Sequence, residues 1–333
     1  MRKLQAIFLF FIAFLLLAAP SCGNSTPTVS RLPKIRLVGT IGPLSIPLAY
    51  MVENDSLASV ADETTLEIWA NPTQLQAIIT GGQADFVSLP TNSAALFYNR
   101  GISLQLLDSS IWNILYLVTT DTSITSVTDL KGKKVVVPYQ GAVPDAIFRV
   151  VLKQHGIDPD SDIEIIYSPD PVQGSQLLLT GVEQYAVLSE PSATSVILKG
   201  QSSGKNFVRV LNMSTEWQKA TGQASPTPVA GTVVIGNIKD RPDVINAFLA
   251  EYEKAVKWML ANPVEAGEVG AKALAEQGFS AGVLTQSMQN IDWEFIPAQD
   301  ARPKIESFFN ALAGISPNFI GGTLPDEGFY FRK

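Results

Sequence analysis

The chain has 333 residues, of which 46% are hydrophobic and only 17% are charged, and its formal net charge is −7. This composition excludes a disordered chain, and the length suffices for two domains or lobes with cores of their own. The 24 basic side chains against 31 acidic ones disfavour a nucleic-acid partner, because phosphate binding requires a concentrated positive field. A single cysteine and a single histidine exclude a disulfide framework, a CxxC-type site and a multi-histidine metal centre. We therefore expect neither a metal nor another cofactor.

The N-terminus is predicted to be a secretory signal peptide, residues 1–21. Arg2 and Lys3 precede an apolar run of 14 residues (6–19), and small residues follow that run. The run is shorter than the roughly 20 residues that cross a bilayer, which disfavours a permanent transmembrane helix. The stretch 23–33 is rich in Asn, Ser, Thr and Pro and is predicted to be a flexible tether.

Short apolar strands alternate with longer helical patterns from residue 34 onward, which is typical of α/β layers. Asn71-Pro72-Thr73 is typical of a helix start with proline in the first turn, and Gly81-Gly82 of a helix end. In this first part we expect strands at Ile35–Val38, Thr65–Trp69, Ala84–Leu89, Leu104–Leu107 and Ile111–Thr119, and helices at Ile46–Val52, at Gln74–Thr80 and after Pro90–Ser93.

The second part continues the alternation and then becomes mainly helical from Pro242 to the end. In the helix after Arg241, an apolar residue recurs at every fourth position from Val244 to Leu260, a stripe typical of a core-facing helix. Here we expect strands at Val135–Val137, Asp162–Tyr167, Tyr185–Leu188 and Thr232–Gly236, and helices at Asp145–His155 and Val172–Leu179.

Catalytic motifs are scarce in this sequence, which contains no GxSxG, HExxH, P-loop or GxGxxG pattern. His155 lies in a predicted last helical turn, where a solvent-facing role is more typical than catalysis. Ligands of open α/β sheets bind beyond the carboxyl ends of strands, where helix N-termini offer unpaired N–H groups. Each strand-to-helix junction alone is typical of a helix cap, but several together favour a binding cleft. Together with the scarcity of catalytic motifs, this favours a binding protein that is not an enzyme. Five such junctions are rich in Gly, Pro, Ser, Thr and Asn: Thr40–Ser45, Asn71–Thr73, Pro90–Ser93, Tyr139–Pro144 and Ser189–Ser192.

Four motifs carry a resemblance to a known family. They are Ile79–Phe86 (ITGGQADF), Ser126–Val135 (SVTDLKGKKV), Leu152–Ile157 (LKQHGI) and Ser189-Glu190-Pro191. In this order and spacing, the chain resembles the substrate-binding lipoproteins of bacterial ABC importers. The resembling branch includes nitrate-, sulfonate/taurine- and thiamine-pyrimidine-precursor-binding proteins, and the resemblance extends from about Lys34 to the last helices.

The resemblance implies a two-lobed α/β fold of the type II periplasmic-binding-protein kind. Each lobe would be a mixed sheet flanked by helices, with two hinge strands near Leu115–Thr119 and Thr232–Gly236. Lobe I would comprise residues 34–117 plus 231–333, and lobe II residues 118–230. The implied function is capture of a small organic ligand between the lobes and delivery to a permease and its ATPase, by a monomer.

The same resemblance implies a lipid anchor at Cys22, the only cysteine. Ala19-Pro20-Ser21 would precede the cut, although the family's usual residue at the position of Ala19 is leucine, and ordinary signal peptidase also accepts this bond. Two or three acyl chains, palmitate among them, anchor a protein stably where one does not. The protein would then be secreted and membrane-anchored, facing the periplasm or the cell exterior.

Carried over residue by residue, the resemblance implies ligand contacts on both lobes. Because no junction carries a basic residue and Asp145 and Glu190 are acidic, a neutral or weakly basic heteroaromatic ligand is favoured. Sulfonate or nitrate stays an alternative ligand if Arg149 or Lys205 reaches the cleft on closure. For Trp112, a role in the core is an equal alternative to stacking on the ligand. The implied contacts are Gly42, Pro43, Leu44 and Ser45; Thr91, Asn92 and Ser93; Trp112 and Asn113 near the hinge; and Gln140, Gly141, Asp145 and Glu190.

Two other functions on the same fold stay open at this point. A ligand-presenting sensor subunit for a membrane receptor has the same sequence features as a transport component. Pyrimidine-synthase-like enzymes resemble the family, but they rely on histidine and a cysteine-rich iron site that one His and one Cys cannot supply. Menaquinone-pathway enzymes share the fold as well, but a secretion signal would misplace them.

Overall fold

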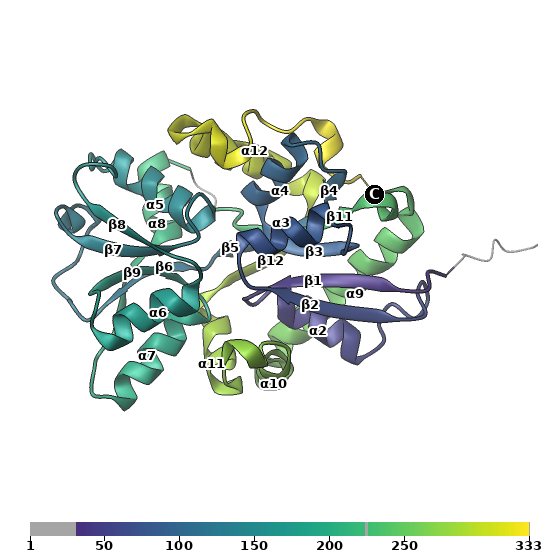
Figure 1. Ribbon diagram of the computed structural model, residues 1–333, viewed down its shortest axis with the longest axis horizontal. Helices are drawn as coiled ribbons and strands as arrows, with labels where there is room; N and C mark the ends of the chain where they lie inside the picture. The colour runs from purple at the N-terminus through teal and green to yellow at the C-terminus, as the bar shows by residue number, and fades with distance from the viewer. Residues whose placement is uncertain (1–30, 224–225, 333) are drawn as a thin grey trace, which may run out of the picture. The chain divides into compact units, whose positions relative to one another are not determined.

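The structure is a computed structural model that describes residues 31–223 and 226–332. The predicted signal peptide, Cys22 and most of the tether lie outside the described residues. Arg31–Lys333 form one compact unit that contains two β-sheets, one of seven strands and one of five (Figure 1). Helices cover both faces of each sheet, so the predicted mixed α/β architecture is confirmed.

The seven-stranded sheet takes its strands from both ends of the compact unit. Its order is β12-β5-β11-β3-β1-β2, with β4 paired to β11. β1 pairs in parallel with β2 and β3, whereas β11 runs antiparallel to β3 and β5. The strands are β1 (Ile35–Thr40), β2 (Thr64–Trp69), β3 (Phe86–Pro90), β4 (Leu104–Leu106), β5 (Asp108–Asn113), β11 (Ala230–Ile235) and β12 (Asp292–Pro297).

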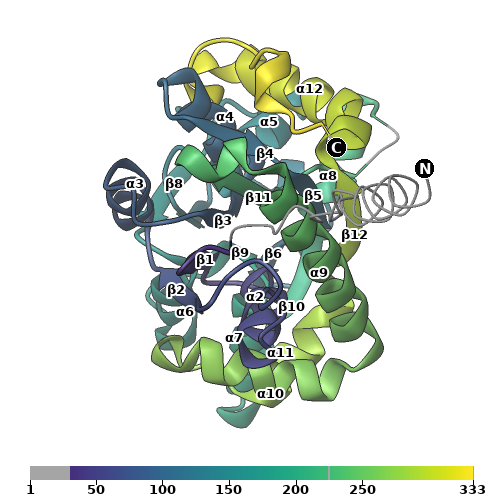
Figure 2. The same ribbon diagram turned by 90° about the vertical axis from the view of Figure 1, so that its right-hand side faces the viewer.

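Seven α-helices accompany this sheet. Helices α2, α10 and α11 lie on one face, and α4 and α12 lie on the other (Figures 1 and 2). Strand β12 lies within the stretch that was predicted to be helical. The helices are α2 (Ser45–Glu53), α3 (Pro72–Thr80), α4 (Thr91–Asn99), α9 (Pro242–Ala261), α10 (Pro263–Ala273), α11 (Ala281–Ser287) and α12 (Ala298–Ile315).

The five-stranded sheet has the order β10-β6-β9-β7-β8. Helices α5 and α8 lie on one face of it, and α6 and α7 lie on the other (Figure 1). Its elements are β6 (Leu115–Thr119), β7 (Lys134–Pro138), α5 (Val143–Gln154), β8 (Glu164–Ser168), α6 (Pro171–Thr180), β9 (Tyr185–Ser189), α7 (Ser192–Ser202), β10 (Val208–Asn212) and α8 (Met213–Thr221).

The chain passes between the two sheets at Ile114 and again between α8 and β11. The apolar run 111–119, predicted as one strand, is therefore two strands in different sheets, β5 and β6. β6 pairs with β9 along its whole length, and β11 pairs with β3, so neither strand spans both sheets. The lobe limits expected from the sequence stay a prediction.

The aromatic stripe of α9 packs into the core of the seven-stranded sheet. Phe248 stacks on Phe86 with ring centroids 4.0 Å apart, and Tyr252 lies 5.5 Å from Phe248. Val244 and Val256 are also buried, as predicted. Leu260 is the exception, 46% exposed, because α9 ends one residue later and its last turn lies beyond the packed part of the stripe. No helix among the described residues is long and apolar enough to span a bilayer.

Asp108 is a fully buried carboxylate in this sheet. Ser110 Oγ and Thr232 Oγ1 donate hydrogen bonds to its two oxygens. Burial raises the pKa of Asp108 from 3.8 to about 6, against the opposing effect of these hydrogen bonds. The folded protein therefore keeps this proton up to about pH 6, whereas the unfolded chain loses it near its ordinary pKa. The free energy of unfolding falls as pH rises between these two values and stays lower above them.

Asp108→Asn should remove this decrease in the free energy of unfolding with rising pH, because the amide cannot ionise. Relative to the wild type, the variant should gain up to about 3 kcal/mol in free energy of unfolding between pH 4 and pH 7. Urea denaturation at unit pH steps measures the difference, with the exposed Asp55→Asn as control. Parallel pH profiles for the wild type and Asp108→Asn would contradict the prediction.

Candidate ligand-binding site

A cleft between the two sheets is the candidate site. Its cavity volume is about 70 Å³, within a wider space of about 560 Å³ that is partly open to solvent. It lies where β1, β2 and β3 of one sheet and β7 and β9 of the other end, at the carboxyl ends at which α/β folds bind ligands. Its lining residues are Thr40, Ile41, Gly42, Pro43, Leu44, Trp69, Leu89, Pro90, Ile111, Ile114, Leu115, Tyr139, Val143, Pro144, Pro171, Ser189, Glu190, Val229 and Ala230.

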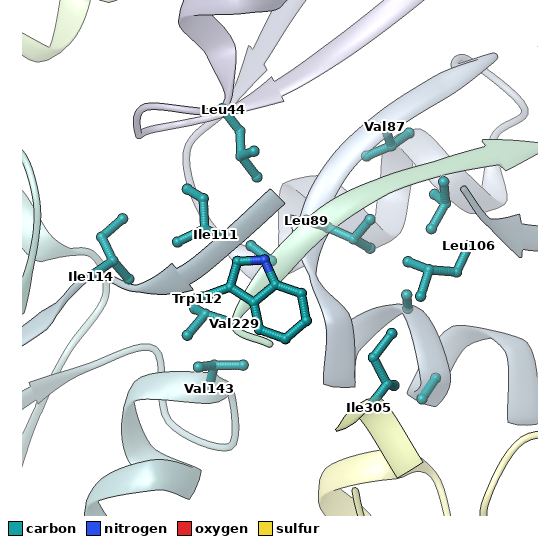
Figure 3. Packing of buried hydrophobic residues seen from close by; sticks show 14 of the residues in the cluster. Leu44, Val87, Leu89, Leu106, Ile111, Trp112, Ile114, Val143, Val229 and Ile305 are labelled. Carbon is teal, nitrogen blue, oxygen red and sulfur yellow. The ribbon is translucent and has the colours of Figure 1, made fainter. Parts of the chain in front are cut away.

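The wall of this cleft is mostly apolar. Figure 3 shows Leu44, Ile111, Ile114, Val143 and Val229 lying close together where the two sheets meet. Among the described lining residues none is Lys, Arg or His, and the only carboxylate is that of Glu190. A cleft of this kind favours a mainly apolar ligand, with a few polar groups fixing its orientation.

Glu190 is fully buried, and its charge is compensated from within the same sheet. Arg209 Nε donates to Oε1 at 2.8 Å, and the N–H of Thr194 donates to Oε2 at 3.1 Å. Burial raises the pKa of Glu190, and the charge of Arg209 opposes that rise. The carboxylate thus satisfies the N-terminus of α7, and Glu190 lies in the wall of the cleft.

Four of the predicted ligand contacts line the cleft: Gly42, Pro43, Leu44 and Glu190. Ser45 does not line it, because its hydroxyl is buried and donates to Thr40 O at 2.6 Å.

The first residues of α4 form hydrogen bonds with other parts of the protein. Thr91 Oγ1 donates to Pro228 O, and Asn92 Nδ2 donates to Phe319 O at 2.9 Å. Ser93 is half-buried on the same helix. None of these three predicted contacts is among the cleft's lining residues.

Trp112 and Asn113 lie outside the cleft lining. Successive residues of a strand face opposite ways, so Ile111 lines the cleft and Trp112 packs into the core beside it (Figure 3). The indole N–H of Trp112 donates to Glu294 O at 2.8 Å. Asn113 Nδ2 donates to the hydroxyl of Tyr116 at 3.1 Å. Of the two roles considered for Trp112, stacking on a ligand or packing in the core, its contacts support packing in the core.

Gln140, Gly141 and Asp145 line a separate polar groove beside the start of α5. Asp145 is buried and accepts hydrogen bonds from the N–H of Gly141 at 2.9 Å and from Arg149 Nε at 2.9 Å. Tyr167 donates to the same carboxylate at 3.0 Å. Arg149 is therefore paired here, and neither it nor Lys205 is among the residues lining the cleft.

Two aromatic residues of the cleft, Trp69 and Tyr139, were missed from the sequence. Trp69 is the last residue of β2, and Tyr139 directly follows β7. The indole N–H of Trp69 donates to Ser88 O at 3.1 Å, and the Tyr139 hydroxyl donates to Ala70 O at 3.2 Å. Tyr139 is the first residue of the predicted junction Tyr139–Pro144, and Trp69 lies two residues before the junction Asn71–Thr73; an aromatic residue at such a strand end is the signal that could have found them.

Four helix N-termini around the cleft have acceptors from the protein, whereas α2 and α5 begin without a side-chain cap. Asn71 Oδ1 accepts from Gln74 N at the start of α3, and Asp170 Oδ1 accepts from Gln173 N at the start of α6. Glu190 serves α7, and the N–H of Thr91 at the start of α4 donates to Val229 O. An anionic ligand would have to compete with these groups.

Comparison with known proteins supports the expected family. Residues 64–168 match the family described as NMT1/THI5 like. No match was found among curated proteins. The matched region covers 105 of the 333 residues and agrees with the resemblance expected from the sequence motifs.

Three solved structures illustrate the similarity. An ABC transporter protein from Parabacteroides distasonis is 23% identical, with a TM-score of 0.71 over 90% of this chain and 99% of that one. The periplasmic aliphatic sulphonate binding protein SsuA from Escherichia coli is 15% identical, with a TM-score of 0.68 over 90% and 92%. A Candida albicans protein with the generic periplasmic binding protein fold is 14% identical, with a TM-score of 0.61 over 89% and 99%. At these identities the similarity shows the fold, which is the predicted one.

Arg209→Met should destabilise the protein by about 3–5 kcal/mol, because it leaves the Glu190 carboxylate buried without its counter-charge. The exposed pair of Lys254 with Glu251 is the control, and Lys254→Met should cost less than about 1 kcal/mol. Adding Glu190→Gln to Arg209→Met should recover much of the loss. Urea denaturation at pH 7 measures all three variants, and equally small effects of Arg209→Met and Lys254→Met would contradict the prediction.

Proposed function

We propose that this protein is an extracytoplasmic solute-binding protein of an ABC importer, which holds a small organic ligand in the cleft and delivers it to the permease. The observation that carries the proposal is an apolar cleft lined by the strand ends of both sheets. The family match and the periplasmic-binding-protein fold support a binding role. We further propose that the chain is a monomer, anchored to the membrane through lipid on Cys22.

The ligand that fits this cleft is neutral or weakly basic, planar and mainly apolar. A sulfonate or nitrate would need basic side chains or unpaired helix N-termini. The described lining supplies no basic side chain, and protein acceptors already serve the starts of α3, α6 and α7. Glu190 would repel an anion but accept a hydrogen bond from an N–H or O–H of the ligand. The proposed class is therefore a heteroaromatic molecule with a hydrogen-bond donor.

A non-enzymatic role agrees with the residues of the cleft. His155 lies at the end of α5, where Nε2 is 3.7 Å from a carboxylate oxygen of Glu216, and it does not line the cleft. The hydroxyl of Tyr139 and the carboxylate of Glu190 both have partners within the protein. We propose that the site binds its ligand and releases it unchanged.

A thermal-shift panel tests the ligand class. Protein comprising residues 23–333, which contains the whole compact unit, is mixed with indole, quinoline, aminopyrimidines, nitrate, taurine or methanesulfonate. A ligand at about 1,000 times its dissociation constant should add roughly 4 kcal/mol of stability and raise the unfolding midpoint. We expect the aromatic molecules to raise it. A midpoint raised by sulfonate or nitrate but by none of the aromatic molecules would contradict the proposed class.

Trp69→Leu should weaken binding of an aromatic ligand about threefold to tenfold, because the indole forms an aromatic wall of the cleft. Trp258→Leu is the matched control, since Trp258 stacks on Tyr50 with centroids 3.9 Å apart and lies outside the cleft. Isothermal titration calorimetry measures both affinities. Equal affinities for the two variants would remove Trp69 from the site.

A further inference from the structure

We infer that Tyr139 is the residue that keeps the cleft closed: its hydroxyl, bonded to the carbonyl of Ala70, fastens the five-stranded sheet to the seven-stranded one and holds the ligand in. This inference rests on the proposed function of the cleft, and it assigns the retention of the ligand to one hydrogen bond.

Tyr139 is fixed to the five-stranded sheet by its backbone. Its N–H donates to Ser168 O at 3.1 Å, and its carbonyl accepts from the N–H of Ala142 at 2.9 Å. Its φ of 58° is in the left-handed region, which a bulky side chain rarely adopts. Such a conformation persists where surrounding contacts hold it, and here the side chain is bonded to the other sheet.

The opposite side of the contact belongs to the seven-stranded sheet and is held firmly. Ala70 directly follows β2, and its N–H donates to Gln74 Oε1 at 2.8 Å. Trp69 is fixed by its indole bond to Ser88 O. The Tyr139 hydroxyl therefore meets an acceptor whose position is set by β2 and the start of α3.

The two aromatic rings contact each other across the cleft and do not hold a ligand between them. The centroids of Trp69 and Tyr139 are 6.1 Å apart, and the rings are tilted by 47°. At that separation the rings contact each other, whereas a third ring stacked between them would need about 7 Å. We expect a planar ligand to lie beside the pair, within the cleft, and to leave faster when Tyr139 separates from Ala70 and Trp69.

The contact also lies in apolar surroundings. Ala70 belongs to an apolar cluster with Ile41 and Ile68 of the seven-stranded sheet's side and Val172 and Leu198 of helices α6 and α7. A hydrogen bond in such a setting is stronger than one in water. Burial also raises the pKa of Tyr139, so the hydroxyl stays protonated and able to donate.

A distance measurement on ligand-free protein tests the contact directly. Residues 23–333 contain no cysteine, so spin labels on Gln76→Cys in α3 and Gln176→Cys in α6 report the separation of the two sides. Tyr139→Phe removes only the hydroxyl and should populate longer distances than the wild type. Tyr98→Phe, which removes a hydroxyl bonded to Asp326 away from the cleft, should not. Identical distributions for the wild type and Tyr139→Phe would overturn the inference.

Ligand release gives a second readout. The complex of Tyr139→Phe with 2-naphthol, a planar fluorescent probe that carries a hydroxyl donor, should dissociate about fivefold faster than that of the wild type. Unchanged dissociation from Tyr139→Phe would also overturn the inference. If the wild type binds neither 2-naphthol nor any panel molecule, the proposed ligand class fails, and the ligand-free distances alone decide whether Tyr139 fastens the two sides.

Discussion

The antiparallel insertion of β11 between β3 and β5 is the constraint on which the rest of the structure depends. It requires the chain to build the whole five-stranded sheet and then return to the middle of the seven-stranded one. The returning strand lies very close to β5. A Cβ at Gly231 would lie 1.9 Å from the carbonyl oxygen of Asp108, so only glycine fits. Because the chain leaves after β5 and comes back into β11, the residues beside both passages, Ile114 and Val229, line the cleft. The topology of the sheet thus places the candidate cleft beside the two points at which the described strands have the chain passing from one sheet to the other.

Charge is arranged so that the cleft itself stays almost neutral. Glu190 accepts hydrogen bonds from Arg209 and from the N-terminus of α7. Asp145 accepts hydrogen bonds from Arg149 and from the N–H of Gly141. Each of these carboxylates is bonded to groups on its own side of the cleft, so closing the cleft buries no unpaired charge. Apolar side chains and the rings of Trp69 and Tyr139 make up most of the lining of the cleft.

Much of the fold could be predicted because turn residues mark strand ends. Asn71 and Pro72 begin α3 as expected, and the junction after β1 placed Gly42, Pro43 and Leu44 at the cleft. The break at Ile114 could not be seen, because an apolar run looks the same whether it forms one strand or two in different sheets. Thr91 and Asn92 were predicted as ligand contacts from the family resemblance, but their partners, Pro228 and Phe319, lie more than 130 residues away in sequence. Trp112 and Ile111 are neighbours in sequence, and only the pairing of β5 decides which of them faces the cleft.

The similarity to sulphonate binding proteins and the apolar lining are consistent with each other. The shared fold fixes where strands end and therefore where a ligand lies, but the residues at those ends decide what it is. In this chain the strand ends carry Trp69, Leu89 and Tyr139, and the helix starts nearby carry Asn71, Asp170 and Glu190 as acceptors. Replacing unpaired N–H groups with capped ones removes the attraction for an anion without altering any strand or helix. Residues at the junctions can therefore change the ligand class of this fold while its strands and helices stay the same.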